Sequence, residues 1–254
     1  MSSLTGKVAI ITGGGKGTGL GIARAFVKEG IAVAITGRGA ESLKAAQVEL
    51  EELVPGARVL TVQADNKDHG AAADVVSRTV AEFGRVDILI NNAQEFRTNI
   101  ALEDMTWDDV ISTYESGVFA TWRFMVAALP HLKEARGTII NMGSGAGTNS
   151  IAKHGAYGPN KEAIRGLSRI AAREWGPHDI TVNVINPYVA SAESERVERE
   201  QPEFIKALQA QLPLGRIGDA ELNVGGLALF LARPEGRYLT GLSIDVDGGG
   251  SIRP

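Results

Sequence analysis

Short runs of apolar, often β-branched residues alternate with longer stretches of helical periodicity along the whole chain. The runs that read as strands are residues 7–12, 32–36, 57–64, 86–91, 137–142, 180–186 and 242–246. Several of these runs are apolar on both faces, which is typical of a parallel sheet buried between helices. Strands that alternate with helices in this way predict a doubly wound, mostly parallel α/β sheet of seven strands.

Helical patterns fill the intervals between the strands. They cover residues 20–30, 41–53, 71–84, 106–132, 163–176 and 220–232. No linker rich in Pro or Ser and no shift in composition divides the chain, so we expect one domain over residues 1–254.

One segment, at about residues 188–218, breaks this alternation because it is charged and irregular. It follows the sixth strand at the carboxyl side of the sheet, where folds of this kind bind their ligands. We expect helical pieces there that close over a substrate. A solvated surface insertion is the alternative that composition leaves open.

Composition excludes several classes of function. The net charge is −4 with no basic block, so we expect no nucleic-acid partner. Cysteine is absent, and the four histidines are scattered without metal-ligand spacing, so we expect no disulfide and no bound metal. No window approaches about 18 consecutive apolar residues, and the N-terminal apolar run is too short for a signal peptide. We expect a cytoplasmic protein without membrane attachment.

A glycine-rich turn, "TGGGKGTG" at residues 12–19, follows the first strand and opens the first helix. Glycines there permit a tight bend and let backbone N–H groups approach a pyrophosphate at the helix N-terminus. The spacing G-x-x-x-G-x-G differs from the usual G-x-G-x-x-G, and an ordinary strand-to-helix turn is the alternative. The candidate cofactor contacts in this turn are Gly13, Gly15, Lys16, Gly17, Thr18 and Gly19.

The second strand ends in "AITGR", with Arg38 where a dinucleotide fold that prefers NAD tends to place an acid. A guanidinium suits the 2′-phosphate of NADP, and Lys16 could reach the same phosphate. We therefore expect NADP(H) to be preferred, with NAD(H) possible. The alternative is that both residues are ordinary surface cations.

A phenol and an amine lie four residues apart in "HGAYGPNKEA", as Tyr157 and Lys161. By itself this pair could be a solvated contact on a helix face, or a half-buried ring with its hydroxyl in water.

The motifs together resemble the short-chain dehydrogenase/reductase family over nearly the whole chain. The matching residues are Thr12, Gly13, Gly17 and Gly19 of the glycine turn, Asp65, the "NNAQ" of residues 91–94, Ser144, the Tyr157–Lys161 pair and Pro187. The resemblance implies a Rossmann-type sheet in a single domain. It also implies further cofactor contacts at Asp65, Asn66, Asn92, Ala93, Tyr157, Lys161, Pro187 and Ala190.

The resemblance also implies the chemistry of the pair. Tyr157 would exchange a proton with a carbonyl or alcohol oxygen while hydride moves to or from nicotinamide, because Lys161 favours the phenolate. Ser144 would hydrogen-bond the same substrate oxygen. Gly158 and Pro159 are tolerable because they would fall near a helix start.

The chain departs from the family pattern around this site. Gln94 and Tyr188 stand where the family usually has Gly, Ala192 where it often has Thr, and Tyr114 where it often has an Asn that holds a relay water. Tyr114 would either replace that water or bind it with its hydroxyl, or pack into the core without a catalytic role. The candidate substrate contacts are Gln94, Phe96, Ala146, Asn149, Ile151, His154 and Tyr188.

These residues predict an NADP(H)-dependent oxidoreductase that interconverts a secondary alcohol and a ketone, with the resemblance implying a homotetramer. Three alternatives stay open: a dinucleotide-binding sensor or scaffold without turnover, an NAD-preferring dehydrogenase, and an enzyme that uses the same tyrosine for dehydration or epimerisation. The residues do not identify the substrate.

Overall fold

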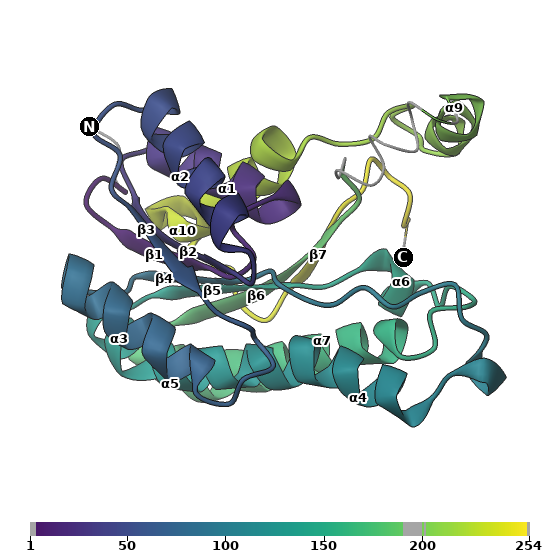
Figure 1. Cartoon of the computed structure of the whole chain (residues 1–254), viewed down its shortest axis with the longest axis horizontal. Helices are drawn as coiled ribbons and strands as arrows, with labels where there is room; N and C mark the ends of the chain where they lie inside the picture. Colours follow the sequence, from purple (N-terminus) through teal and green to yellow (C-terminus); the bar gives the residue numbers. More distant parts are fainter. Residues whose placement is uncertain (1–3, 190–199, 201, 253–254) are drawn as a thin grey trace.

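The computed structural model describes residues 4–189, 200 and 202–252. Seven parallel strands form one sheet in the order β3-β2-β1-β4-β5-β6-β7 (Figure 1). They are β1 (Val8–Ile11), β2 (Ala32–Gly37), β3 (Val59–Gln63), β4 (Ile88–Asn91), β5 (Thr138–Met142), β6 (Thr181–Pro187) and β7 (Ser243–Val246). The predicted seven strands are all confirmed, and every neighbouring pair is parallel.

Helices cover both faces of the sheet (Figure 1). One face carries α1 (Gly17–Lys28), α2 (Ala40–Leu53) and α10 (Gly226–Ala232), and the other carries α3 (Ala71–Phe83), α5 (Ala120–Ala135) and α7 (Tyr157–Trp175). The helices α4 (Trp107–Tyr114), α6 (Gly145–Thr148) and α9 (Pro202–Ala210) lie toward the right of Figure 1, with α4 below and α9 above. No described helix is both long and apolar enough to cross a bilayer.

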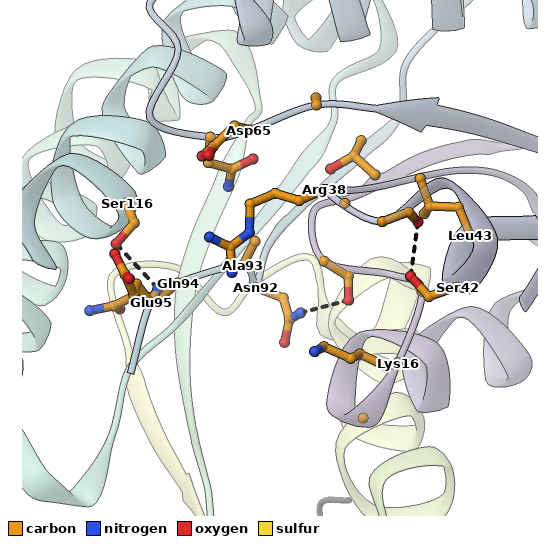
Figure 2. A pocket seen from close by; sticks show the side chains of 18 of the residues that line it. Lys16, Arg38, Ser42, Leu43, Asp65, Asn92, Ala93, Gln94, Glu95 and Ser116 are labelled. Carbon is orange, nitrogen blue, oxygen red and sulfur yellow. Dashed lines mark hydrogen bonds between the residues drawn. The ribbon is translucent and has the colours of Figure 1, made fainter. Parts of the chain in front are cut away.

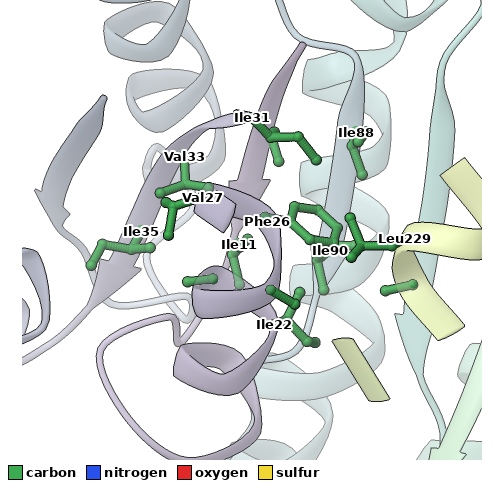
Figure 3. Packing of buried hydrophobic residues seen from close by; sticks show 14 of the residues in the cluster. Ile11, Ile22, Phe26, Val27, Ile31, Val33, Ile35, Ile88, Ile90 and Leu229 are labelled. Atoms are coloured by element: carbon green, nitrogen blue, oxygen red, sulfur yellow. The ribbon is translucent and has the colours of Figure 1, made fainter. Parts of the chain in front are cut away.

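Alternation along the strands divides the core into two layers. Ile11 of β1 packs with Ile22 and Phe26 of α1 on one face, as Figure 3 shows. The adjacent Ile10 joins Phe124 of α5 in the cluster on the other face. Successive strand residues point to opposite faces, so a strand that is apolar throughout needs helices on both sides.

The stretch 106–132, predicted as one helix, is interrupted. A π-helical turn, Glu115–Phe119, separates α4 from α5. The cause is a contact with α7: the Asn160 Oδ1 accepts a hydrogen bond from the Val118 N–H at 2.9 Å. A Cβ at Gly117 would lie 2.1 Å from the Asn160 Nδ2, so the glycine makes room for this side chain. A second π-helical turn, Ala220–Gly225, precedes α10 within the helix predicted at 220–232.

The segment predicted to close over a substrate is described only in part. Residues 190–199 and 201 lie outside the described residues, while α9 confirms one helical piece. The segment returns to the sheet where Val189 forms a parallel bridge with Gly218. Its role as a substrate loop stays a prediction.

Candidate functional site

The loops that follow β1 and β4 are tied together by one threonine side chain. The Thr12 Oγ1 accepts hydrogen bonds from the N–H groups of Asn92 at 2.9 Å and Ala93 at 3.0 Å. The Asn92 side chain returns a bond to the Thr12 carbonyl at 2.9 Å. Both strands are parallel and adjacent, so their carboxyl ends meet at one edge of the sheet. These three hydrogen bonds fix the position of the glycine turn.

The glycines of the turn have different roles. Gly13 has a φ of +66°, and a Cβ at Gly19 would lie 2.3 Å from the Gly13 carbonyl oxygen. Gly19 therefore lets α1 begin close against the turn. Gly17 has a φ of +53°, and a Cβ there would meet nothing within 4 Å. Its backbone faces open space, where a ligand could approach closely.

A cavity of about 550 Å³ opens beside this turn (Figure 2). Its volume is in the range of pockets that hold small ligands and cofactors. Ten of the residues predicted as cofactor or substrate contacts line it: Gly13, Gly15, Lys16, Gly17, Arg38, Asp65, Asn66, Asn92, Ala93 and Gln94. The predicted contacts Thr18 and Gly19 are not among its lining residues.

Sequence reasoning missed several lining residues, among them Ser42, Leu43, Lys67, Glu95 and Ser116. Ser42 lies in the first turn of α2, four residues after Arg38, so its place at the wall of the cavity could have been predicted. Ser116 had no signal of this kind, because the π-helical turn that positions it was not predicted.

Two cations face the cavity. The side chains of Lys16 and Arg38 come from the loops after β1 and β2 and extend into the same space (Figure 2). Both residues are exposed, and neither forms an ion pair within the described part of the chain. The Asp65 carboxylate accepts a bond from the Lys67 N–H at 3.0 Å, which fixes the loop after β3 at the cavity wall.

Lys161 is buried, with 5% of its surface exposed. Its Nζ donates to the Met142 carbonyl at the end of β5, at 2.6 Å, and lies 5.5 Å from the centroid of the Tyr157 ring. Burial lowers the pKa of Lys161 to about 7. The amine is therefore near the midpoint of its titration at neutral pH.

Tyr157 is the first residue of α7, which places Gly158 and Pro159 near the helix start as predicted. Burial raises the pKa of its phenol above the ordinary value, and a hydrogen bond with the Ser144 side chain opposes that change. Ser144 itself caps α6, because its Oγ accepts from the Ala146 N–H at 3.1 Å. The structure thus brings Ser144, Tyr157 and Lys161 together.

Two predicted substrate residues surround the phenol. The ring of Phe96 meets the Tyr157 ring edge-on at 4.9 Å between centroids, and His154 lies 6.2 Å from Tyr157. A parallel bridge between Ile100 and His154 joins the loops that carry them.

The remaining predicted substrate residues are placed differently. Ala146 is buried, and the Asn149 Nδ2 donates to the Ser251 Oγ at 2.7 Å near the C-terminus. Tyr188 and Ile151 are exposed, and Pro187 ends β6. Ala190 and Ala192 lie outside the described residues.

Comparison with known proteins agrees with this geometry. The sequence profile described as Enoyl-(Acyl carrier protein) reductase matches residues 13–251. A 12alpha-hydroxysteroid dehydrogenase from Clostridium sp. is 40% identical over 260 residues, covering 100% of both chains. A short-chain dehydrogenase/reductase mutant from Serratia marcescens is 32% identical, with a TM-score of 0.88 over 98% of this chain and 99% of that one. The chain belongs to the short-chain dehydrogenase/reductase family.

A further family structure, the blue fluorescent protein from a metagenomic library in complex with NADPH, is 34% identical. Its TM-score is 0.89 over 99% of this chain and 100% of that one. The family binds a nicotinamide cofactor, and the cavity fits such a group. The fit is seen in Gly17, whose missing side chain leaves the backbone open to a phosphate, and in the cations Lys16 and Arg38.

Gln94, in place of the family's usual glycine, lines the cavity wall, yet both polar atoms of its carboxamide are buried without a hydrogen-bond partner among the described residues. Such groups are rare in native proteins because leaving them unpaired costs on the order of 1–3 kcal/mol. The Gln94 carboxamide therefore presents an unused donor and an unused acceptor at the cavity wall.

Tyr114 ends α4 and is half-buried, with its ring edge-on to Phe119 at 6.1 Å between centroids. Its hydroxyl makes no hydrogen bond, to Lys161 or to any other residue, within the described part of the chain. A catalytic role of Tyr114 stays a prediction.

Alanine substitutions at Gly17 and Gly19 should distinguish a glycine needed for ligand binding from a glycine needed for packing. Gly17→Ala should lower the free energy of unfolding by only about 1–2 kcal/mol, the cost of a left-handed alanine, while NADPH binding weakens at least about tenfold. Gly19→Ala should destabilise the fold more, because its Cβ meets the Gly13 carbonyl. Urea unfolding and titration of NADPH fluorescence measure the two effects. Unweakened NADPH binding by Gly17→Ala would show that this glycine does not approach the cofactor.

The buried lysine should make stability depend on pH. The pKa of Lys161 is lowered to about 7 from 10.5, so between these values the unfolded chain binds a proton that the folded protein does not. The free energy of unfolding should therefore rise with pH across this window, by at most about 1.4 kcal/mol per pH unit, because the cost of burying the amine is greatest at pH 7 and below and falls as pH approaches 10.5.

Urea unfolding of the cofactor-free protein at several pH values checks this. Lys161→Met should abolish that rise, whereas Lys133→Met, at an exposed position, should keep it. Equal slopes in the wild type and Lys161→Met would contradict the expectation.

Proposed function

We propose that the protein is an NADP(H)-dependent oxidoreductase that interconverts a secondary alcohol and a ketone. The observation that best supports this proposal is the cluster after β5 and at the start of α7: the phenol of Tyr157 lies close to Ser144 and beside the buried amine of Lys161. Each group has a role in moving a proton to or from a substrate oxygen. The membership in an oxidoreductase family agrees with it.

When bound, the nicotinamide accepts or supplies a hydride. The protein's own residues then act on the substrate oxygen. Ser144 hydrogen-bonds that oxygen and polarises the carbonyl. Tyr157 gives it a proton during ketone reduction and removes one during alcohol oxidation. A protonated Lys161 favours the phenolate and so eases the loss of that proton.

Preference for NADP(H) rests on charge at the cavity. Lys16 and Arg38 extend into it, and Arg38 holds the position at the end of β2 where NAD-preferring folds place an acid. A guanidinium and an ammonium together favour a 2′-phosphate. The structural relative solved with NADPH supports the same cofactor. An NAD(H)-preferring enzyme is the alternative.

The substrate we propose is a secondary alcohol or ketone on an apolar ring system. Phe96 leaves 66% of its surface exposed beside Tyr157, so an apolar wall faces the reacting position. The Clostridium relative's name adds hydroxysteroids as the first compounds to test. Absorbance at the reduced nicotinamide band, with hydroxysteroids and smaller alcohols as substrates, tests this. Failure with every compound would favour the second candidate, a dinucleotide-binding protein without turnover, to which the replaced residues Gln94 and Tyr114 point.

Tyr157→Phe should retain NADPH binding and lower kcat by about 10²–10⁴, because only the proton donor is removed. The control is the NADPH dissociation constant, which should stay within about twofold of the wild type. If the variant kept more than about a tenth of the wild-type activity, Tyr157 would not be the general acid.

Arg38→Asp should weaken NADPH and narrow or reverse the preference over NADH. A carboxylate repels the 2′-phosphate and accepts a hydrogen bond from a 2′-hydroxyl. The ratio of kcat/KM for the two cofactors measures the change. Arg136→Asp, on the far side of the sheet at the end of α5, is the control. An unchanged ratio in Arg38→Asp would show that Arg38 does not contact the phosphate.

We further propose that the protein is a homotetramer. Large apolar side chains lie exposed on α4, α5 and α7: Trp107 at 73%, Trp122 at 54%, Val126 at 43% and Ile170 at 57%. Exposed large apolar side chains on neighbouring helices are typical of contacts with other chains. Light scattering at micromolar concentration should give the mass of four chains, and Trp122→Glu should lower it. A wild-type monomer would contradict the proposal.

A further inference from the structure

Phe96 is a large apolar ring in an irregular loop, and burial alone does not hold it. It lies between β4 and α4, outside any helix or strand, with 66% of its surface exposed. Nevertheless its ring lies edge-on to Tyr157 at 4.9 Å. A ring pair of this kind contributes only about 0.5–1.5 kcal/mol, less than a loop needs to stay in one arrangement.

The residues on either side of Phe96 are both charged and both paired. The Glu95 carboxylate accepts a hydrogen bond from the Ser112 Oγ and lies 3.4 Å from the Lys67 Nζ. Arg97 donates to Glu95 at 3.3 Å and to the Asp109 Oδ1 at 2.6 Å. These contacts join three parts of the chain at one place: the loop after β3, the loop after β4, and α4.

The partners of this network are held by regular structure. Ser112 and Asp109 belong to α4, and Asp109 also completes a capping box with Thr106 at the start of that helix. Asp109 has 15% of its side chain exposed and Arg97 37%, so the pairs are partly shielded from water. A shielded network with several hydrogen bonds fixes geometry better than an isolated surface pair. Glu95 stays ionised in it, since the Ser112 bond, with help from Lys67 and Arg97, lowers the pKa of its carboxyl.

The two sides of the loop therefore face different helices. Glu95 and Arg97 contact α4, whereas Phe96 between them contacts Tyr157 at the start of α7. We propose that Glu95 and Arg97 form a clamp that positions Phe96 beside Tyr157, and that the clamped ring selects substrates carrying an apolar ring system. The selection of substrates rests on the proposed function, but the clamp itself does not.

The clamp assigns distinct roles to the three residues. Phe96 is the surface that a ring-shaped substrate contacts while its oxygen reaches Tyr157 and Ser144. Glu95 and Arg97 are positioning residues that touch no substrate. Glu95 and Lys67 also line the cavity beside the glycine turn, so the same network forms part of the wall of that cavity.

Fluorine NMR of the cofactor-free protein tests the clamp without any substrate. The chain has four tyrosines, so 3-fluorotyrosine labelling gives four resonances, and Tyr157→Phe identifies one of them. Phe96→Ala should shift the Tyr157 resonance, because it removes the ring current of the neighbouring ring. Arg97→Gln should shift it in the same direction by a smaller amount.

Two further variants make the result decisive. Arg97→Gln should cause no additional shift when Phe96→Ala is already present, because the clamp acts through that ring. Arg78→Gln, which removes an exposed ion pair with Asp74 on α3, is the matched control and should leave the resonance unchanged. Thermal unfolding verifies that each variant is folded. An unmoved Tyr157 resonance in Arg97→Gln, or equal shifts from it in both backgrounds, would overturn the clamp.

Kinetics test the selection of substrates. Phe96→Ala should raise KM for a ring ketone such as an oxosteroid about three- to tenfold, with kcat and the KM for a small acyclic ketone little changed. Arg97→Gln should also raise KM for the ring ketone, and the double variant should show no larger rise than Phe96→Ala alone. An equal rise in KM for both ketones would refute the proposed substrate selectivity. The clamp itself would still be decided by the NMR measurement. Absence of turnover in the wild type with every ketone would refute the proposed function and, with it, the selectivity.

Discussion

The parallel pairing of strands that are buried on both faces is the constraint on which the rest of the structure depends. A parallel strand must return through a crossover, and here the crossovers are the helices that cover each face. All carboxyl ends therefore meet at one edge, where Thr12 after β1 can bond Asn92 and Ala93 after β4. The glycine turn, the cavity and the cluster of Ser144, Tyr157 and Lys161 all lie along this edge.

A buried amine gives the site its chemical character. Lys161 lies behind the Tyr157 ring, held by the Met142 carbonyl, in surroundings that favour its neutral form. Burial acts on Tyr157 in the same sense, because it raises the pKa of the phenol and keeps it protonated. In the cofactor-free protein the Tyr157 phenol is therefore protonated, while the charge on Lys161 changes near pH 7. The two groups are tuned by the same physical cause, desolvation.

The features shared with the family and the residues that depart from its pattern lie in different parts of the site. The shared features depend on backbone geometry, as in Gly13 and Gly19, where a side chain would collide with neighbouring atoms. The wall depends on side chains of the loop after β4. There the Gln94 carboxamide has no hydrogen-bond partner among the described residues, and Glu95 and Arg97 contact α4. Such a loop can change its ligand contacts without disturbing the sheet.

The sequence by itself determined the seven strands, the burial of several of them on both faces and the order of the motifs, because these follow from local periodicity and from glycines with special backbone geometry. It placed Tyr157 and Lys161 on one helix face for the same reason. It could not reveal the interruption between α4 and α5, since that depends on Asn160 reaching the Val118 N–H from α7. Nor could it show that Lys161 is buried or that Arg97 meets Asp109. Only the tertiary structure decided these features, because each depends on a contact between residues that are distant in the sequence. Such contacts can interrupt a helix, bury a charged side chain or pair two charges, and local periodicity does not reveal them.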